Sequence, residues 1–145
     1  MVDQSVFDKY LKERFEPEVK WYDTKSMHNQ KWAKIYQVAI IILSVTTPVF
    51  AASEFKWLTL ISSVALSIAV GVLKYCKFEE LWQSYRTTCE TLKKEKILFD
   101  SKISPYDKCD DPMKMFITRV ESMISKENTS WCQLIAKKEK KEDKG

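Results

Sequence analysis

The strongest constraint on the fold is a pair of uncharged segments in the middle of the chain. Residues 35–53 have the sequence IYQVAIIILSVTTPVFAAS, and residues 57–73 have the sequence WLTLISSVALSIAVGVL. A helix that crosses a bilayer needs roughly 20 predominantly apolar residues, with about 17 as the lower limit. A chain of 145 residues contains too little other protein to bury two helices that are apolar on every side. Both segments are therefore predicted to span a membrane.

The two segments are joined by the short connection Glu54–Lys56, which requires a tight antiparallel hairpin. Lysines gather at the open end of the hairpin, away from this connection: Lys20, Lys25, Lys31 and Lys34 precede the first segment, and Lys74 and Lys77 follow the second. Lys and Arg are enriched in the cytoplasmic loops of membrane proteins. We therefore expect a multi-pass protein of the cell (inner) membrane with both termini in the cytoplasm.

Apolar and aromatic side chains continue beyond the second segment at heptad spacing. The positions are Phe78, Trp82, Tyr85, Cys89 and Leu92, separated alternately by four and three residues. No Gly or Pro interrupts residues 72–104, so one continuous helix is expected over residues 57–101. We expect this helix to form a stalk whose heptad positions provide an assembly seam between copies of the chain. Farther on, Asp111 followed by Pro112 predicts the start of another helix.

The sequence thus predicts an all-α membrane protein that is homo-oligomeric. Its two-span transmembrane helical hairpin is expected to continue into a long cytoplasmic helical stalk and bundle. The expected segments are N-terminal cytoplasmic helices over 1–34, transmembrane helices over 35–53 and 57–75, a cytoplasmic helical bundle over 76–136, and a charged tail over 137–145.

The composition argues against catalysis. The two glycines, Gly71 and Gly145, are too few for a Gly-rich phosphate loop, and His28 is the single histidine. A His-rich zinc site or a nucleophile–histidine pair is therefore a poor candidate. We expect no enzymatic activity, no cofactor and no metal site. Acidic residues are interleaved with the basic ones at a net charge of +4, so we also expect no nucleic-acid binding.

Small polar residues recur within both predicted spans. They are Gln37, Ser44 and Thr47 in the first span, and Thr59, Ser63 and Ser67 in the second. Such residues let helices approach closely or exchange hydrogen bonds, and they can also line a narrow water-filled path. Helix packing and pore lining both remain open as interpretations.

An ion-pair network is predicted on the stalk. Arg86 and Glu90 lie four residues apart beside the heptad positions, and Asp23 is the natural partner from the neighbouring helix. A buried arginine requires a carboxylate, so we expect Arg86 to be buried and paired. The network either fixes the register of the helices or acts as a switch that couples the bundle to the spans.

Several motifs resemble a known family. They are WYD at 21–23, the block FEELWQSYRTTCETLKKEKILF, and a closing pattern of Tyr106, Phe116, Arg119, Val120, Glu121 and Trp131. The most specific part is YRxxxExLxxE, formed by Tyr85, Arg86, Glu90, Leu92 and Glu95. Over residues 7–135 the chain resembles the SLATT superfamily, the SMODS and SLOG-associating two-transmembrane effector domains of bacteria.

That resemblance implies a membrane effector of a prokaryotic conflict or defence system, which oligomerises to form a channel or pore. It implies the lipid bilayer and further copies of the chain as partners, together with a nucleotide-sensing partner protein. A non-conducting membrane scaffold, assembled through its cytoplasmic helical bundle, is the alternative function.

Overall fold

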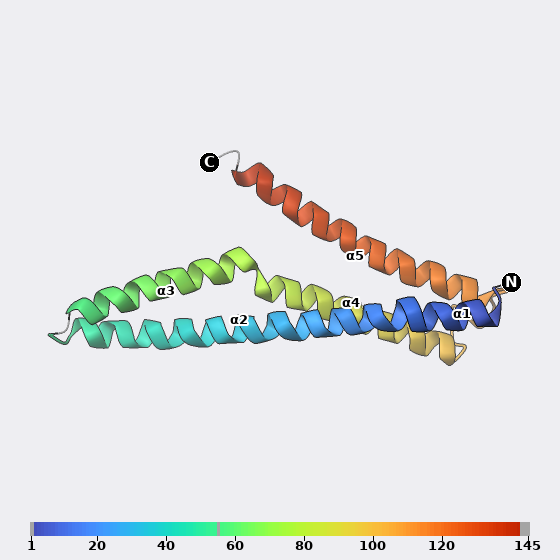
Figure 1. The fold of residues 1–145 in the computed structure, drawn as a ribbon, viewed down its shortest axis with the longest axis horizontal. Coiled ribbons are helices and arrows are strands. Elements are labelled where there is room, and N and C mark those ends of the chain that lie inside the picture. The colour runs from blue at the N-terminus through green and yellow to red at the C-terminus, as the bar shows by residue number, and fades with distance from the viewer. Residues whose placement is uncertain (1, 55, 143–145) are drawn as a thin grey trace. The chain divides into compact units, whose positions relative to one another are not determined.

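The computed structural model describes the backbone of residues 2–54 and 56–142, and the side chains of these residues up to position 129. The described residues are almost entirely helical and contain no strand (Figure 1). The elements are α1 (Gln4–Tyr10), a π-helical turn (Leu11–Phe15), α2 (Glu16–Ala51), α3 (Lys56–Cys76), α4 (Phe78–Asp100) and α5 (Pro112–Glu142). The expectation of an all-helical chain is confirmed.

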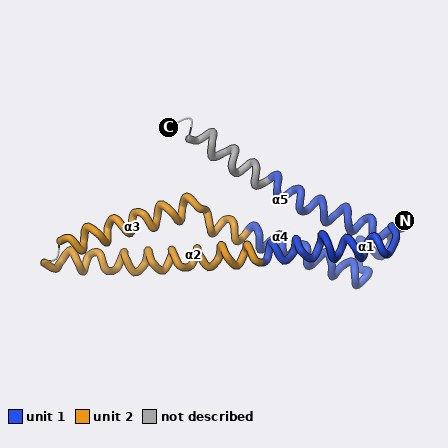
Figure 2. Tube along the Cα trace, in the orientation of Figure 1, with its two compact units in different colours: residues 1–23, 84–145 blue, residues 24–83 orange. Residues whose placement is uncertain are grey.

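The chain divides into two compact units (Figure 2). Unit 1 consists of residues 1–23 and 84–145, and unit 2 consists of residues 24–83. Helices α2 and α4 each contribute residues to both units. Pro17 lies one residue after the start of α2, which continues without a break from the π-helical turn, since Glu16 has right-handed helical backbone angles. Proline has no N–H to donate and its ring crowds the carbonyl four residues earlier, and the wider π-helical turn just before it accommodates both effects.

Unit 2 contains an antiparallel hairpin of α2 and α3 (Figure 1). The hydroxyls of Thr47 and Ser62 meet across the hairpin at 2.7 Å between their Oγ atoms. Ser62 and Ala69 are the buried residues of α3, and their small side chains allow the two helices to pack closely. At the end of α2, Ser53 donates its backbone N–H to the carbonyl of Phe50 at 3.1 Å, which closes the helix before the connection.

The hairpin presents apolar side chains outward. Both helices of the hairpin are long and apolar enough to cross a membrane. Only 6% of the most apolar 18-residue window is buried in the helix that ends at Ala51, and 11% in the helix that begins at Lys56. The core helix of a water-soluble protein would bury most of such a window. The exposed apolar residues are Val38, Ile41, Ile42, Val45 and Val49 on α2, and Leu60, Ile61, Val64 and Ile68 on α3.

Unit 1 has an aromatic core. Phe7, Phe99 and Phe116 come from α1, α4 and α5, and the ring centroids of Phe7 and Phe116 each lie 5.0 Å from that of Phe99. Phe116, Val120 and Ile124 recur every four residues along α5, and all three are buried. This spacing places them on one face of the helix, which explains why α5 packs on the unit.

Three residues of the predicted assembly seam belong to this core. Tyr85, Cys89 and Leu92 are 9%, 0% and 0% exposed within a single chain, so they are not available to a second copy. Phe78 and Trp82 lie in unit 2 and are half-buried. The heptad spacing therefore marks an intramolecular core at Tyr85, Cys89 and Leu92. Residues of α2 cover part of it, since Trp21 and Tyr22 contact Tyr85 and the Val19 carbonyl lies 3.6 Å from Cys89 Sγ.

The expected continuous helix over residues 57–101 is wrong at one residue. Helix α3 ends at Cys76 and α4 begins at Phe78, because Lys77 between them has a φ of 49°. This left-handed conformation is uncommon for a residue with a side chain. The predicted helix start at Asp111 and Pro112 is confirmed, since α5 begins at Pro112 and Asp111 Oδ1 accepts the backbone N–H of Lys114 at 3.1 Å.

The left-handed backbone of Lys77 generates a stability prediction. Lys77→Gly should leave the free energy of unfolding unchanged or raise it by up to about 1 kcal/mol, because glycine adopts this φ without strain. Lys77→Ile should lower it by about 1 kcal/mol or more. Both variants lose the 2.8 Å ion pair with Glu80, so their difference isolates the backbone term.

The measurement is thermal unfolding of the full chain in detergent micelles, followed by circular dichroism. Lys94, which is exposed within α4, is the control position, where the order should reverse because glycine costs about 1 kcal/mol inside a helix. An equal effect of glycine at the two positions would show that residue 77 does not break the helix.

Candidate functional site

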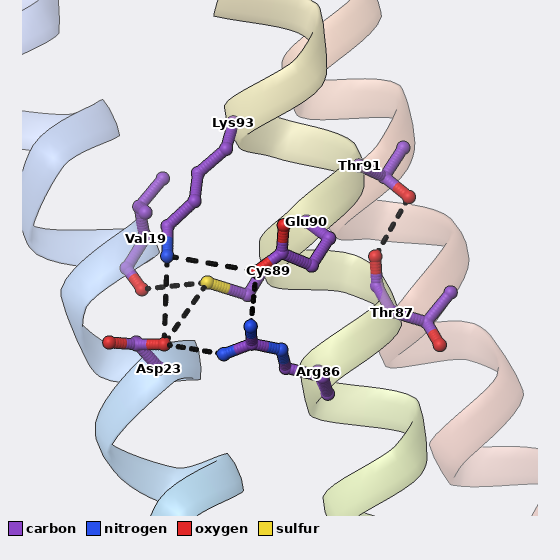
Figure 3. Close-up of polar contacts among 8 residues, drawn as sticks. All are labelled: Val19, Asp23, Arg86, Thr87, Cys89, Glu90, Thr91 and Lys93. Carbon is purple, nitrogen blue, oxygen red and sulfur yellow. Dashed lines mark hydrogen bonds and ion pairs between the residues drawn. The ribbon is translucent and has the colours of Figure 1, made fainter.

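A charge cluster joins α2 to α4 within unit 1 (Figure 3). It consists of Asp23, Arg86, Glu90 and Lys93. Asp23 Oδ1 lies 3.4 Å from Arg86 Nη1 and 3.6 Å from Lys93 Nζ. Arg86 Nη2 lies 2.8 Å from Glu90 Oε1, one helical turn along α4. Two cations therefore share the carboxylate of Asp23, which links the two helices.

The predicted burial of Arg86 is wrong. Its side chain is 49% exposed, and those of Asp23 and Glu90 are 34% and 51% exposed. Tyr85 and Cys89 occupy the buried face of α4, so Arg86, one position after Tyr85, points to the rim of that face. Exposed ion pairs contribute about 0.2–1 kcal/mol each, so the charge cluster adjusts the contact between the helices more than it stabilises the fold.

Cys89 is the buried residue beside the charge cluster. Its Sγ lies 3.6 Å from the carbonyl oxygen of Val19 and 3.8 Å from Asp23 Oδ1 (Figure 3). Burial raises the pKa of the Cys89 thiol and outweighs the opposing effect of the nearby Lys93 ammonium, and the Asp23 carboxylate acts in the same direction as burial. The side chain therefore stays a neutral thiol at pH 7, which makes it a weak hydrogen-bond donor and a poor nucleophile.

A second polar group, the buried triad of Glu95, Tyr106 and Arg119, lies deeper in unit 1. Glu95 is 3% exposed, and both of its carboxylate oxygens accept hydrogen bonds from Arg119, with Nη2 to Oε2 at 3.2 Å. Tyr106 donates its hydroxyl to Oε1 of the same carboxylate. Burial alone would raise the pKa of Glu95, but the hydrogen bonds from Arg119 and Tyr106 outweigh burial and hold the pKa below its usual value.

Sequence reasoning did not identify this triad as a site. Glu95 closes the YRxxxExLxxE motif, and Tyr106 and Arg119 belong to the closing pattern, but the three were not connected. A usable signal was present in the spacing, because Glu95 lies three residues after Leu92 on the buried face of α4. A carboxylate at a buried helical position requires a cation or several hydrogen-bond donors from another element.

An open groove of about 400 Å³ lies elsewhere in unit 1, lined by Arg14, Glu121, Ile124, Ser125, Asn128 and Thr129. Arg14 Nε lies 3.2 Å from Glu121 Oε1, and its Nη1 lies 3.4 Å from Glu18. The hydroxyl of Tyr10 also donates to Glu121 at 2.9 Å. The guanidinium is therefore neutralised by carboxylates of its own chain and is not free to bind an anion.

The six polar residues singled out in the two spans do not share one surface. Thr47 faces Ser62 inside the hairpin. The hydroxyl of Thr59 is buried and has no hydrogen-bond partner among the described residues. Gln37, Ser44 and Ser67 are exposed, and Ser63 is half-buried. Of the six, Gln37, Ser44 and Ser67 are thus the ones fully placed where they could face water, lipid or another copy.

The described residues contain no group of three or more His, Cys, Asp or Glu side chains arranged to hold a metal ion. In unit 1 the carboxylates of Asp23, Glu95 and Glu121 are each paired with an arginine. Each of these ion pairs joins two different helical segments of unit 1.

Comparison with known proteins places the chain in a family. Residues 17–114, more than half of the chain, match the family described as "Protein of unknown function (DUF4231)". The chain belongs to this family. The matched region includes the whole α2–α3 hairpin, the charge cluster, and Glu95 and Tyr106 of the buried triad. No curated protein and no solved structure matches the chain.

The difference between the buried triad and the charge cluster can be measured. Arg119→Ala should lower the free energy of unfolding by roughly 3 kcal/mol, because it leaves the carboxylate of Glu95 buried with only Tyr106 as a donor. Arg86→Ala should lower it by about 1 kcal/mol or less, because its partners are half-exposed. Thermal or denaturant unfolding of the two variants beside the wild type makes the comparison.

The two variants are matched, since each removes one arginine from unit 1 and each arginine is partly exposed. Equal losses of stability would mean that burial of the carboxylate does not decide the strength of these pairs.

Proposed function

We propose that this chain is a small membrane protein, anchored in the bilayer by the α2–α3 hairpin. Several copies assemble in the bilayer and form a channel or pore. The exposed apolar residues on the outer faces of α2 and α3 support the anchoring, because hydrocarbon solvates such faces better than water does. Satisfied backbone hydrogen bonds within each helix are the other requirement for a membrane span.

The observation that carries the pore is an exposed polar pair on α2. Gln37 and Ser44 are seven residues apart and therefore lie on one face, two helical turns from each other. Pro48 follows one turn later and is also exposed. A single hairpin cannot enclose a water path, so this face of α2 lines the path only when several copies surround an axis.

The second span provides a surface for assembly. Ser67 is exposed, and four residues later no heavy atom outside its own helix lies within 4 Å of the space that a side chain at Gly71 would occupy. Small residues four apart on an exposed helix face allow a helix of another copy to approach closely in a membrane. In the proposed assembly α3 contacts the neighbouring copy and α2 faces the axis.

The resemblance to the SLATT superfamily supports an effector role in a prokaryotic conflict system, triggered by a nucleotide-sensing partner protein. The lysines at the open end of the hairpin support an orientation with both termini in the cytoplasm of a bacterial cell and the hairpin in its inner membrane. In this orientation unit 1 is the cytoplasmic part that would receive the signal.

A non-conducting scaffold is the second candidate, and one observation favours it. The hydroxyl of Ser44 donates to the carbonyl of Ile40 at 2.7 Å, and that of Ser67 donates to Ser63 at 3.0 Å. These hydroxyls are satisfied within their own helices and do not require water. No charged residue lies within either span.

Conduction through reconstituted protein tests the proposal. In planar bilayers under a salt gradient, Ser44→Asp should shift the reversal potential toward cation selectivity and Ser44→Lys toward anion selectivity, because each places a ring of charge around the axis. Ser44→Ala is the control and should leave selectivity unchanged. Bilayers that stay silent with inserted protein, or equal selectivity in all four proteins, would contradict the pore and favour the scaffold.

A further inference from the structure

A shallow apolar groove lies on the surface of α2 within unit 2. It is open, has a volume of about 380 Å³, and is lined by Lys34, Ile35, Val38, Ala39 and Ile42. One wall of the groove is formed by Lys34, Val38 and Ile42, which follow one another at intervals of four residues. Ile35 lies on the other wall. Ala39, the smallest side chain of the five, leaves the space between them. The groove follows the helix for about 12 Å, at 1.5 Å per residue.

One end of this groove is strongly positive. Lys34 lines it, and Lys31 lies one helical turn before Lys34 on the same side of α2. Both lysines are exposed, and neither forms an ion pair with any residue that the structure describes. Residues 24–53 contain no Asp or Glu, so α2 offers these two cations no carboxylate along this length.

Aromatic residues mark the depth at which these lysines would lie in a bilayer. Trp32 and Tyr36 flank Lys34 in the sequence, and their ring centroids are 6.1 Å apart. Tyr36 also stacks on Phe78 at 5.8 Å within unit 2. Tryptophan and tyrosine concentrate at the headgroup level of membranes. With these rings at that level, Lys31 and Lys34 meet phosphates, and Val38 and Ile42 meet acyl chains.

We propose that this groove binds one anionic phospholipid, with its phosphate at Lys31 and Lys34 and an acyl chain along Val38, Ala39 and Ile42. The inference rests on the proposed insertion of the hairpin into the bilayer. A free phosphate would use the two lysines but leave the apolar walls uncovered. A helix of a second copy would cover the walls but would have to bring carboxylates to the two lysines. An anionic lipid satisfies both halves of the site in one molecule.

Native mass spectrometry of the full chain in detergent micelles tests the binding. The probes are phosphatidylglycerol, phosphatidylcholine with the same acyl chains, and glycerol phosphate without chains. The wild type should prefer phosphatidylglycerol. The double variant Lys31→Gln/Lys34→Gln should bind it roughly 25-fold more weakly, at about fivefold for each lysine. Lys56→Gln, at the other end of the hairpin, is the charge control and should bind as the wild type does.

A second variant separates the groove from the charge. Ala39→Leu fills the floor of the groove and should weaken binding of phosphatidylglycerol without changing the net charge. Ala51→Leu, an exposed position on the same helix, is its matched control. Circular dichroism of each variant shows that the helices are retained.

The outcomes distinguish this site from the proposed function. Equal affinity for the two lipids, competition by glycerol phosphate at the same concentration as the lipid, or wild-type binding by the double variant would each overturn the site. A chain that does not insert into vesicles of either lipid would overturn the site and the membrane function together. Selective lipid binding in bilayers that carry no current would support the site and contradict only conduction.

Discussion

The structure depends on one constraint, which is that the outer faces of the α2–α3 hairpin are apolar and the chain does not cover them. Ile41 and Val45 on α2 and Leu60 and Ile68 on α3 are all more than half exposed. Exposed apolar surface of this extent is unfavourable in water. The polar side chains that meet inside the hairpin, those of Thr47 and Ser62, are small. The hairpin is therefore suited to a bilayer. With the apolar part of the hairpin in the hydrocarbon, the lysines and aromatic rings at its open end would lie at the level of the lipid headgroups, as proposed.

Unit 1 meets a different requirement, since it must hold four helical segments together with few residues. It does so with a cluster of phenylalanines and one buried carboxylate, Glu95, whose charge is compensated by Arg119 and Tyr106. The charge cluster around Asp23 is half-exposed, so each of its ion pairs contributes little to stability. If unit 1 receives a signal, as proposed, the Asp23 contacts can rearrange at a lower cost than the buried triad, because breaking the triad leaves a carboxylate uncompensated.

Hydrophobic patterning was enough to predict the two long apolar helices, and the capping signal of Asp111 and Pro112 was enough to predict the start of α5, because both signals are local in the sequence. It could not predict the helix break at Lys77, since a left-handed residue without Gly or Asn leaves no local signal. The seam at Cys89 was recognised as apolar, but its spacing is the same for an intramolecular core and an intermolecular coiled coil. The pairing of Glu95 with Arg119 depends on how α5 returns to α4, which spacing within either helix does not determine.

The central claim is that the hairpin crosses the bilayer with its connection on the far side from both termini. It is tested most directly by adding one cysteine to the wild-type chain, either at Glu54 or at Lys34. Intact cells that carry each variant are treated with a membrane-impermeant thiol reagent. The account predicts labelling of Glu54→Cys in intact cells and of Lys34→Cys only after permeabilisation, with the wild type as the control for the native cysteines. Labelling of Glu54→Cys only after permeabilisation would contradict the orientation, and equal labelling of both positions in intact cells would contradict the membrane hairpin.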